Sequence, residues 1–182
     1  QAEYIRTGLE FDRFWNNVNK ILKSCPRVIV TFMSTYNALS VFNYSKLINE
    51  VYNLKKTYGS SDRYWNSATF LDTSYLRWPT HQTVKVLPHQ FSKNIEEQLT
   101  MMSYQATPAF DWTHIGYSDI EVQKVKRIYD WMLSPQDAAE QMKNRHNFYK
   151  YFSEHDRRRG TNFVKTFPEL EEFYNFCKEI QL

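Results

Sequence analysis

Polar side chains that could bind a ligand lie at the end of the most apolar segment of this sequence. The segment spans residues 27–33, contains Thr31 and is followed by Ser34 and Asn37. If it forms a central parallel strand, these three side chains lie near its carboxyl end, where open α/β sheets bind ligands. Hydroxyl and amide groups can donate and accept hydrogen bonds, as a ligand of mixed polarity requires. The alternative is a turn in which Asn37 or Ser40 bonds its own backbone.

A second group of candidates follows a strand predicted near residues 67–72. Arg77 and Trp78 could form an ion pair with a substrate or stack on it. Packing at the surface is the alternative for both residues. Asp72 could line the mouth of a cavity, or it could cap a loop.

The cysteines and histidines show no spacing typical of a metal site. The two cysteines are 152 positions apart in this sequence, so they cannot form a C-x-x-C pair. No Cys/His cluster has the spacing of a zinc site. We therefore predict no metal ligands in this chain, and we interpret all five histidines as structural or solvated (His81, His89, His114, His146 and His155).

A run of three arginines at residues 157–159 has aromatic residues on both sides. Basic and aromatic side chains together can bind single-stranded nucleic acid through phosphate contacts and stacking. Acidic residues surround the run, however, and would pair with its charges (Glu154, Asp156, Glu169, Glu171 and Glu172). A solvated turn with salt bridges is therefore the favoured interpretation, and nucleic acid is not an expected partner.

The composition is that of a soluble globular protein. Of 182 residues, 42% are hydrophobic and 24% charged, which is too apolar for a disordered chain and too polar for a membrane protein. The net charge of +3 is small, so it gives no separate argument for nucleic acid. The longest apolar run is far too short to cross a bilayer, so no membrane partner is expected. Two distant cysteines are typical of a reduced, cytoplasmic protein.

The hydrophobic pattern predicts a βα half followed by a helical half. Apolar residues at positions 11, 14, 15, 18, 21 and 22 have helical spacing, and no strand precedes them. Segment 27–33 is expected to be a strand buried on both faces. A helix at 43–58, the strand at 67–72 and an extended piece at 83–88 complete the first half. Helices are predicted at 89–103, 118–133, 135–152 and 168–180. The expected division is therefore 1–88 and 89–182.

The first forty residues resemble the second half of a radical S-adenosylmethionine barrel. That family carries Arg-x-Gly after its fourth strand, then a Phe and an Asn-Val pair on the helix. Arg6, Gly8 and Phe11, followed by Asn17 and Val18, match this pattern. Further segments are similar to the family and to the C-terminal part of its twitch-domain enzymes: the polar turn at 31–37, the proline-containing stretch at 76–88, and the helical tail at 144–152 and 156–163.

The resemblance implies an α/β fold, the C-terminal part of a partial (β/α) barrel with parallel strands and a helical tail. It implies that Arg6 pairs with the carboxylate of S-adenosylmethionine, a task that suits a planar guanidinium. Thr31, Ser34 and Asn37 would contact the same cofactor, and Arg77 and Trp78 the substrate. An ion pair of Arg6 with Glu3 or Glu10 is the alternative.

The family's Cys-x-x-x-Cys-x-x-Cys motif, which binds a [4Fe-4S] cluster, has no counterpart in this sequence. Three clustered thiolates are needed, and Cys25 and Cys177 cannot replace them. We therefore expect the cluster ligands, and a partner electron donor, outside this chain. The expected function is cofactor and substrate binding in a longer enzyme that uses the 5′-deoxyadenosyl radical, with a peptide or protein as one possible substrate. This portion alone would be inactive. The alternative is a non-catalytic helical module that binds protein or nucleic acid.

Overall fold

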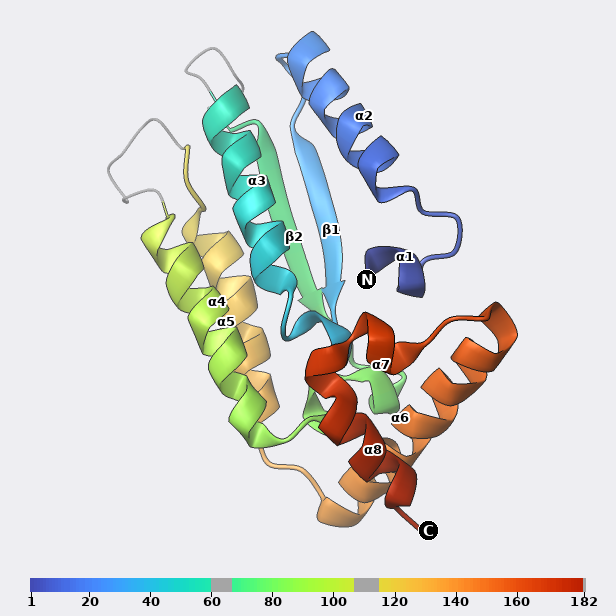
Figure 1. Ribbon diagram of the computed structural model, residues 1–182. Coiled ribbons are helices and arrows are strands. Elements are labelled where there is room, and N and C mark those ends of the chain that lie inside the picture. Colours follow the sequence, from blue (N-terminus) through green and yellow to red (C-terminus); the bar gives the residue numbers. More distant parts are fainter. Residues whose placement is uncertain (60–66, 107–114, 182) are drawn as a thin grey trace.

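The computed structural model describes residues 1–59, 67–106 and 115–181. Two strands, β1 (Val30–Tyr36) and β2 (Thr69–Tyr75), pair in parallel, with Val30 opposite Thr69 and Tyr36 opposite Tyr75. Helix α3 (Tyr44–Tyr58) connects them, as a parallel pair requires. Figure 1 shows this unit in the upper half of the molecule, with the C-terminal helices α6 to α8 below it.

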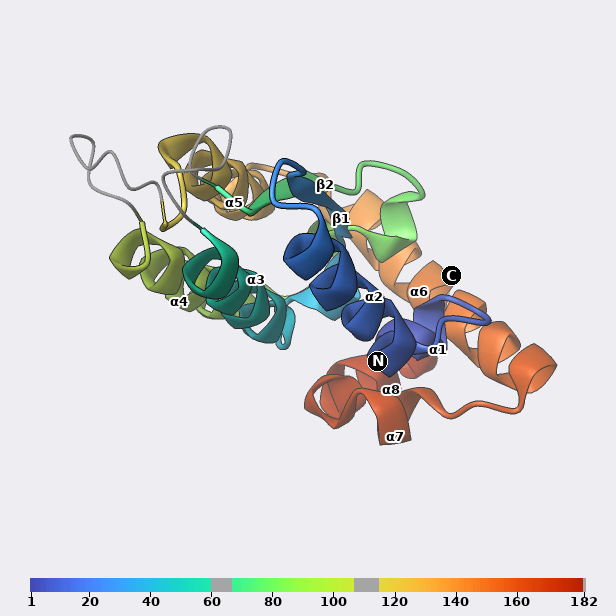
Figure 2. The same ribbon diagram turned by 90° about the horizontal axis from the view of Figure 1, so that it is seen from above.

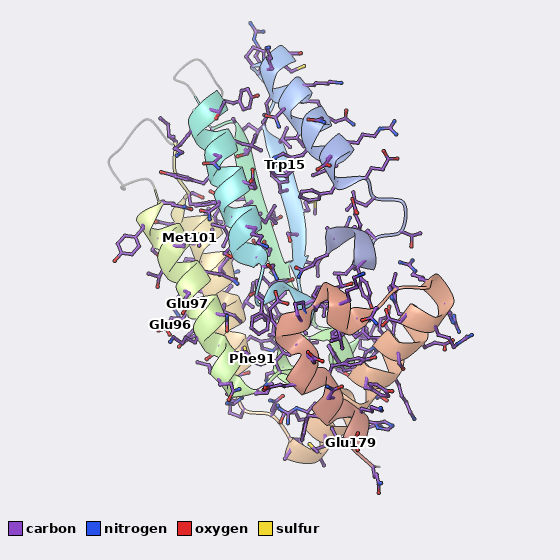
Figure 3. The ribbon with its side chains drawn as sticks, in the orientation of Figure 1. Trp15, Phe91, Glu96, Glu97, Met101 and Glu179 are labelled. Atoms are coloured by element: carbon purple, nitrogen blue, oxygen red, sulfur yellow. The ribbon has the colours of Figure 1, made fainter. Side chains whose placement is uncertain are left out.

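One face of the two-stranded sheet is covered by α3 and by α2 (Phe11–Ser24), which lie on the same side of the strands (Figure 2). The side chains of Phe32 and Leu71 on this face are buried. Trp15 lies on the side of α2 that faces β1 (Figure 3), with its ring centroid 5.4 Å from that of Phe32. Side chains alternate between the faces of a strand, so the covered face takes every second residue of β1 and β2.

The opposite face of the sheet carries Thr31, Met33 and Thr35 from β1, all three exposed. Met33 has 79% of its surface accessible. The prediction that 27–33 is a strand buried on both faces is therefore wrong. The strand begins at Val30, three residues after the predicted start. The preceding residues form a turn, in which the amide of Val28 donates to the carbonyl of Cys25 (3.0 Å).

The outer edge of β2 is closed by a buried ion pair. Nζ of Lys55 donates to the carbonyl of Thr69 (2.9 Å), and the carboxylate of Glu121 accepts from the amide of Leu71 (2.7 Å). Nζ and the carboxylate lie 3.1 Å apart, and both side chains are almost fully buried. Glu121 belongs to α5 (Asp119–Leu133), where its carboxylate also accepts from the amide of Ser118 (2.8 Å) in a capping box.

The outer edge of β1 is open. The amide of Val30 donates to the carbonyl of Ala68 on the β2 side, so alternate residues of β1 point their backbone groups toward β2. Thr31, Met33 and Thr35 therefore direct theirs away from β2. No residue in the described part of the chain forms a backbone hydrogen bond with these three. The sheet is thus closed at one edge and unpaired at the other.

Helix α4 (Ser92–Tyr104) packs against α5 beside the sheet. The remaining helices are α6 (Ala138–Arg159), α7 (Phe163–Thr166) and α8 (Glu171–Glu179). They share an aromatic cluster with the short α1 (Ala2–Ile5) at the N-terminus. In this cluster the ring of Tyr4 lies 5.3 Å from Phe167 and 6.3 Å from Phe163.

The structure confirms most of the predicted helices. Helix α3 matches the prediction at 43–58, and α5 matches that at 118–133. Helix α6 is longer than predicted and begins at Ala138, because the side chain of Asp137 caps it by accepting from the amide of Glu140 (2.8 Å). The extended piece predicted at 83–88 is wrong, since Val84–Val86 forms a 3₁₀ turn.

The mixed α/β architecture with a parallel sheet is present, while the partial barrel and the division at residue 88 stay predictions. In the described ranges, no helix has both the length and the apolar character that spanning a bilayer demands.

Candidate functional site

The open face of the sheet is the first part of the candidate site. We use this name for Thr31, Met33 and Thr35 of β1 with the paired Phe70, Asp72 and Ser74 of β2. Parallel strands place paired residues on the same face, so these six side chains form one surface. None of the six is buried: four are exposed, and Phe70 and Asp72 are half-buried. The open face is therefore available to a ligand or to further protein.

One charge on the open face is paired. The carboxylate of Asp72 forms an ion pair with Nζ of Lys124 from α5, and both side chains are about two-thirds to three-quarters buried. The same Nζ lies 5.6 Å from the centroid of the Phe70 ring. The ion pair with Lys124 therefore fixes the side chain of Asp72 on the β2 half of the open face. Asp72 is a polar group on this face and does not cap a loop there.

The second part of the site is a cavity at the carboxyl ends of the strands, which we call the strand-end pocket. It has a volume of about 90 Å³ that water-sized molecules can enter. Its lining comes from α1, from the turn after β1, from the segment after β2, and from α6. The lining residues are Tyr4, Ile5, Asn37, Ala38, Leu39, Gln82, Tyr151, Phe152, His155 and Arg159.

Asn37 connects the turn after β1 to this pocket. Its side-chain oxygen accepts from the amide of Leu39 (2.9 Å), while the amide of Asn37 donates to the hydroxyl of Ser40 (3.2 Å). This is the self-capped turn that the sequence allowed as an alternative. The capping uses the side-chain oxygen, so the side-chain NH₂ group is left for another partner at the pocket.

Thr31 and Ser34 lie on opposite faces of β1, since they are an odd number of positions apart. Thr31 belongs to the open face. Ser34 belongs to the covered face, where its hydroxyl bonds that of Tyr44. The Tyr44 hydroxyl also lies 2.7 Å from that of Thr73. Burial raises the pKa of Tyr44 to about 12, and these two hydrogen bonds oppose the rise. The structure therefore does not bring Ser34 together with Thr31.

Arg6 follows α1 and is exposed. Neither of the ion pairs suggested as alternatives forms. The carboxylate of Glu3 accepts from the amide of Phe11 (2.9 Å), and that of Glu10 lies 3.6 Å from the guanidinium of Arg13. Among the described residues the side chain of Arg6 has no ion-pair partner. Its guanidinium therefore stays available for an anion.

Arg77 and Trp78 follow β2 in an exposed segment. The guanidinium of Arg77 donates to the hydroxyl of Tyr75 (2.7 Å) and lies 5.0 Å from the centre of its ring. Trp78 is 79% exposed. Contact with Tyr75 accounts for the position of Arg77, whereas a large indole in water marks a surface that a partner or substrate could cover.

The arginine run at 157–159 is divided by its contacts. Arg157 and Arg158 both bond the carboxylate of Glu154 at 2.6 Å, as the acidic surroundings predicted. These contacts lower the pKa of Glu154 to about 2. Arg159 points elsewhere and lines the strand-end pocket.

The sequence analysis missed the pocket residues Gln82, His155 and Arg159 as ligand-binding candidates. No local signal connects them, because they come from segments more than seventy positions apart. His114, which the sequence led us to interpret as structural or solvated, lies outside the described residues. Comparisons with family models, with curated proteins and with solved structures found no match to this chain.

Proposed function

We propose that this chain is the cofactor- and substrate-binding part of a radical S-adenosylmethionine enzyme. The observation that carries the proposal is the open, largely polar face of a parallel βα unit beside an unpaired strand edge. Such a face is what the interior of a (β/α) barrel presents when its other strands come from elsewhere. The Arg6 motif of the sequence points to the same class.

S-adenosylmethionine has a carboxylate, an amino group and a ribose that need both donors and acceptors. In the proposal, Arg6 binds the carboxylate through its free guanidinium. The hydroxyl of Thr31 and the side-chain NH₂ group of Asn37 bind polar groups of the same ligand. Bound, this cofactor would supply the 5′-deoxyadenosyl group for hydrogen abstraction. The chain itself contributes orientation and the exclusion of water.

The [4Fe-4S] cluster of this enzyme class does not fit the residues of this chain. Three clustered thiolates are required. Cys25 is exposed and Cys177 is buried, and burial raises the pKa of the Cys177 thiol to about 12, which disfavours a thiolate. The proposal therefore assigns cluster binding to polypeptide outside this chain.

The contact data weaken the alternative of a nucleic-acid module. Arg157 and Arg158 both pair with Glu154, which offsets one of their two positive charges, so the run is not an unpaired basic surface. A protein-binding role stays open at Trp78, but no second observation favours it.

The test is anaerobic reconstitution of the intact protein that contains this chain with iron and sulfide, followed by S-adenosylmethionine and dithionite. We expect 5′-deoxyadenosine as a product. Arg6→Gln should weaken cofactor binding about tenfold, as loss of a charge-assisted bidentate contact predicts. Arg13→Gln is the matched control, because Arg13 is a neighbouring exposed arginine that already pairs with Glu10. Absence of deoxyadenosine, or equal effects of the two substitutions, would overturn the proposal.

A further inference from the structure

We infer that the strand-end pocket binds the carboxylate of a small aliphatic molecule. This site shares Asn37 with the proposed cofactor contacts but uses neither Arg6 nor the open face. It goes beyond the proposed function because it needs neither the cofactor nor a cluster. Its position outside the carboxyl ends of two parallel strands is where α/β sheets place ligands.

The cation of this pocket is Arg159. One of its nitrogens donates weakly to the carbonyl of Tyr4 (3.3 Å), and no carboxylate pairs with it among the described residues. The adjacent acid, Asp156, already accepts from the hydroxyl of Tyr4 (2.8 Å) and the amide of Phe163 (2.6 Å). A third donor, the hydroxyl of Thr161, lies 2.7 Å away. Asp156 is therefore engaged with other groups, and the guanidinium retains donors for an incoming anion.

The pocket also contains a polar atom that lacks a partner. Nδ1 of His155 is buried without a hydrogen bond, and the nearest carboxylate oxygen, that of Asp156, is 3.9 Å away. The cost of burying an unpaired polar atom makes such an atom uncommon in a folded protein. Burial, and then the charge of Arg159, lower the pKa of His155, whereas Asp156 and the backbone of Tyr4 oppose that shift. A ligand oxygen bound by both Arg159 and His155 would satisfy the imidazole.

Apart from Arg159, the free polar groups of the lining are uncharged: Asn37 and Gln82 contribute side-chain NH₂ donors, and Gln82 also contributes an amide oxygen. The side-chain NH₂ groups of Asn37 and Gln82 face a lining that contains no Asp or Glu. Hydrogen-bond donors together with a guanidinium select a carboxylate rather than an amine.

The remainder of the lining is mostly hydrocarbon and includes the rings of Tyr4 and Tyr151. Ile5, Ala38, Leu39 and Phe152 supply the hydrocarbon surface. A volume of about 90 Å³ exceeds what one water molecule needs. It is well below the several hundred Å³ of pockets that hold drug-sized ligands. The occupant is therefore a short aliphatic carboxylate, or the carboxylate end of a longer molecule.

The experiment titrates the full 182-residue chain, free of iron and S-adenosylmethionine, with butyrate and follows side-chain amide signals by NMR. We expect saturable shifts of the Asn37 and Gln82 amide signals at millimolar butyrate. Arg159→Gln should weaken binding at least tenfold, whereas Arg158→Gln, which removes a neighbouring exposed arginine paired with Glu154, should leave it unchanged. Butylamine should produce no shifts at these signals.

A second substitution keeps the test decisive if Arg159→Gln fails to fold. Gln82→Leu removes a lining donor without touching the Tyr4 contact of Arg159, and it too should weaken butyrate binding. Absence of saturable shifts, equal losses with Arg158→Gln and Arg159→Gln, or butylamine binding as strong as butyrate would each overturn the inference. None of these results bears on cofactor binding through Arg6, so the two proposals fail independently.

Discussion

The buried carboxylate of Glu121 should be one of the most important single groups for the stability of this fold. It accepts from the amide of Leu71 (2.7 Å) and the amide of Ser118 (2.8 Å), and it pairs with Nζ of Lys55 at 3.1 Å. Glu121→Ala removes these three contacts and a fourth, from the hydroxyl of Ser118 (2.9 Å). Nζ of Lys55 would then keep the hydrogen bond to the carbonyl of Thr69 and the ring of Tyr117, 5.2 Å away, but no anion.

The expected loss follows from these contacts. Removing one partner of a buried ion pair costs about 3–5 kcal/mol, because the other charge stays buried without compensation. The amides of Leu71 and Ser118 also lose their acceptor, which adds to this loss. Glu121→Gln should cost less than the alanine substitution, since its side-chain oxygen still accepts from Leu71. Against a total stability of roughly 5–15 kcal/mol, the alanine variant loses a large share.

The assay is urea unfolding followed by circular dichroism at about pH 7 and about pH 9. Burial lowers the pKa of Lys55, and Glu121 opposes that effect, so the pKa should fall further in Glu121→Ala. Between the lowered folded value and the ordinary unfolded value of about 10.4, the unfolded chain binds more protons. Stability of the variant should therefore rise with pH in this window, and its deficit should be smaller at pH 9.

Two results would refute this reasoning. A loss of unfolding free energy below about 1 kcal/mol in Glu121→Ala would show that the carboxylate does not stabilise the outer edge of β2. A deficit that is the same at both pH values would show that the stranded charge of Lys55 is not its cause. Ser118→Ala serves as the control, because it removes the cap of α5 and one hydroxyl contact to Glu121 but keeps the ion pair with Lys55. It should cost about 1 kcal/mol.

Three further changes test other parts of the fold by the same urea assay. Met33→Lys on the open face should alter stability by less than about 0.5 kcal/mol, whereas Leu71→Ala on the covered face should cost about 2–5 kcal/mol; similar costs would contradict the assignment of the faces. Asp156→Ala should cost about 2–3 kcal/mol and speed hydrogen exchange of the Phe163 amide, and unchanged exchange would argue against that contact. Gly160→Ala should cost about 1 kcal/mol because its φ is +64°, and a neutral effect would contradict the left-handed end of α6.

Local patterns predicted the helices well because their signals are local. The Ser118 and Glu121 pair is a capping box within four residues, and it starts α5 where the sequence placed it. The faces of β1 were harder to predict. Val28, Phe32 and Met33 are all apolar, so hydrophobicity alone could not show that Met33 faces solvent. An apolar strand is buried on both faces only where other elements cover both faces of the sheet, and the sequence of the strand does not show whether they do.

The site was predicted in part. The self-capped turn at Asn37 and the pairing of Arg157 and Arg158 with acids depend on neighbours in sequence. The pairing was expected, whereas the turn was the alternative to ligand binding by Asn37. The strand-end pocket depends on His155 and Arg159 approaching the turn after β1, which only tertiary packing determines. Its residues carry no shared motif, so pattern reasoning from one sequence could not connect them.

The two edges of the sheet differ in what they permit. With Lys55 and Glu121 bonded to the outer backbone groups of β2, another strand could join there only by displacing α5, whereas the backbone groups beside Thr31, Met33 and Thr35 can accept one. Any larger sheet built on this unit would therefore have β2 as its last strand. Such a sheet could not close into a ring through β2 unless α5 moved away.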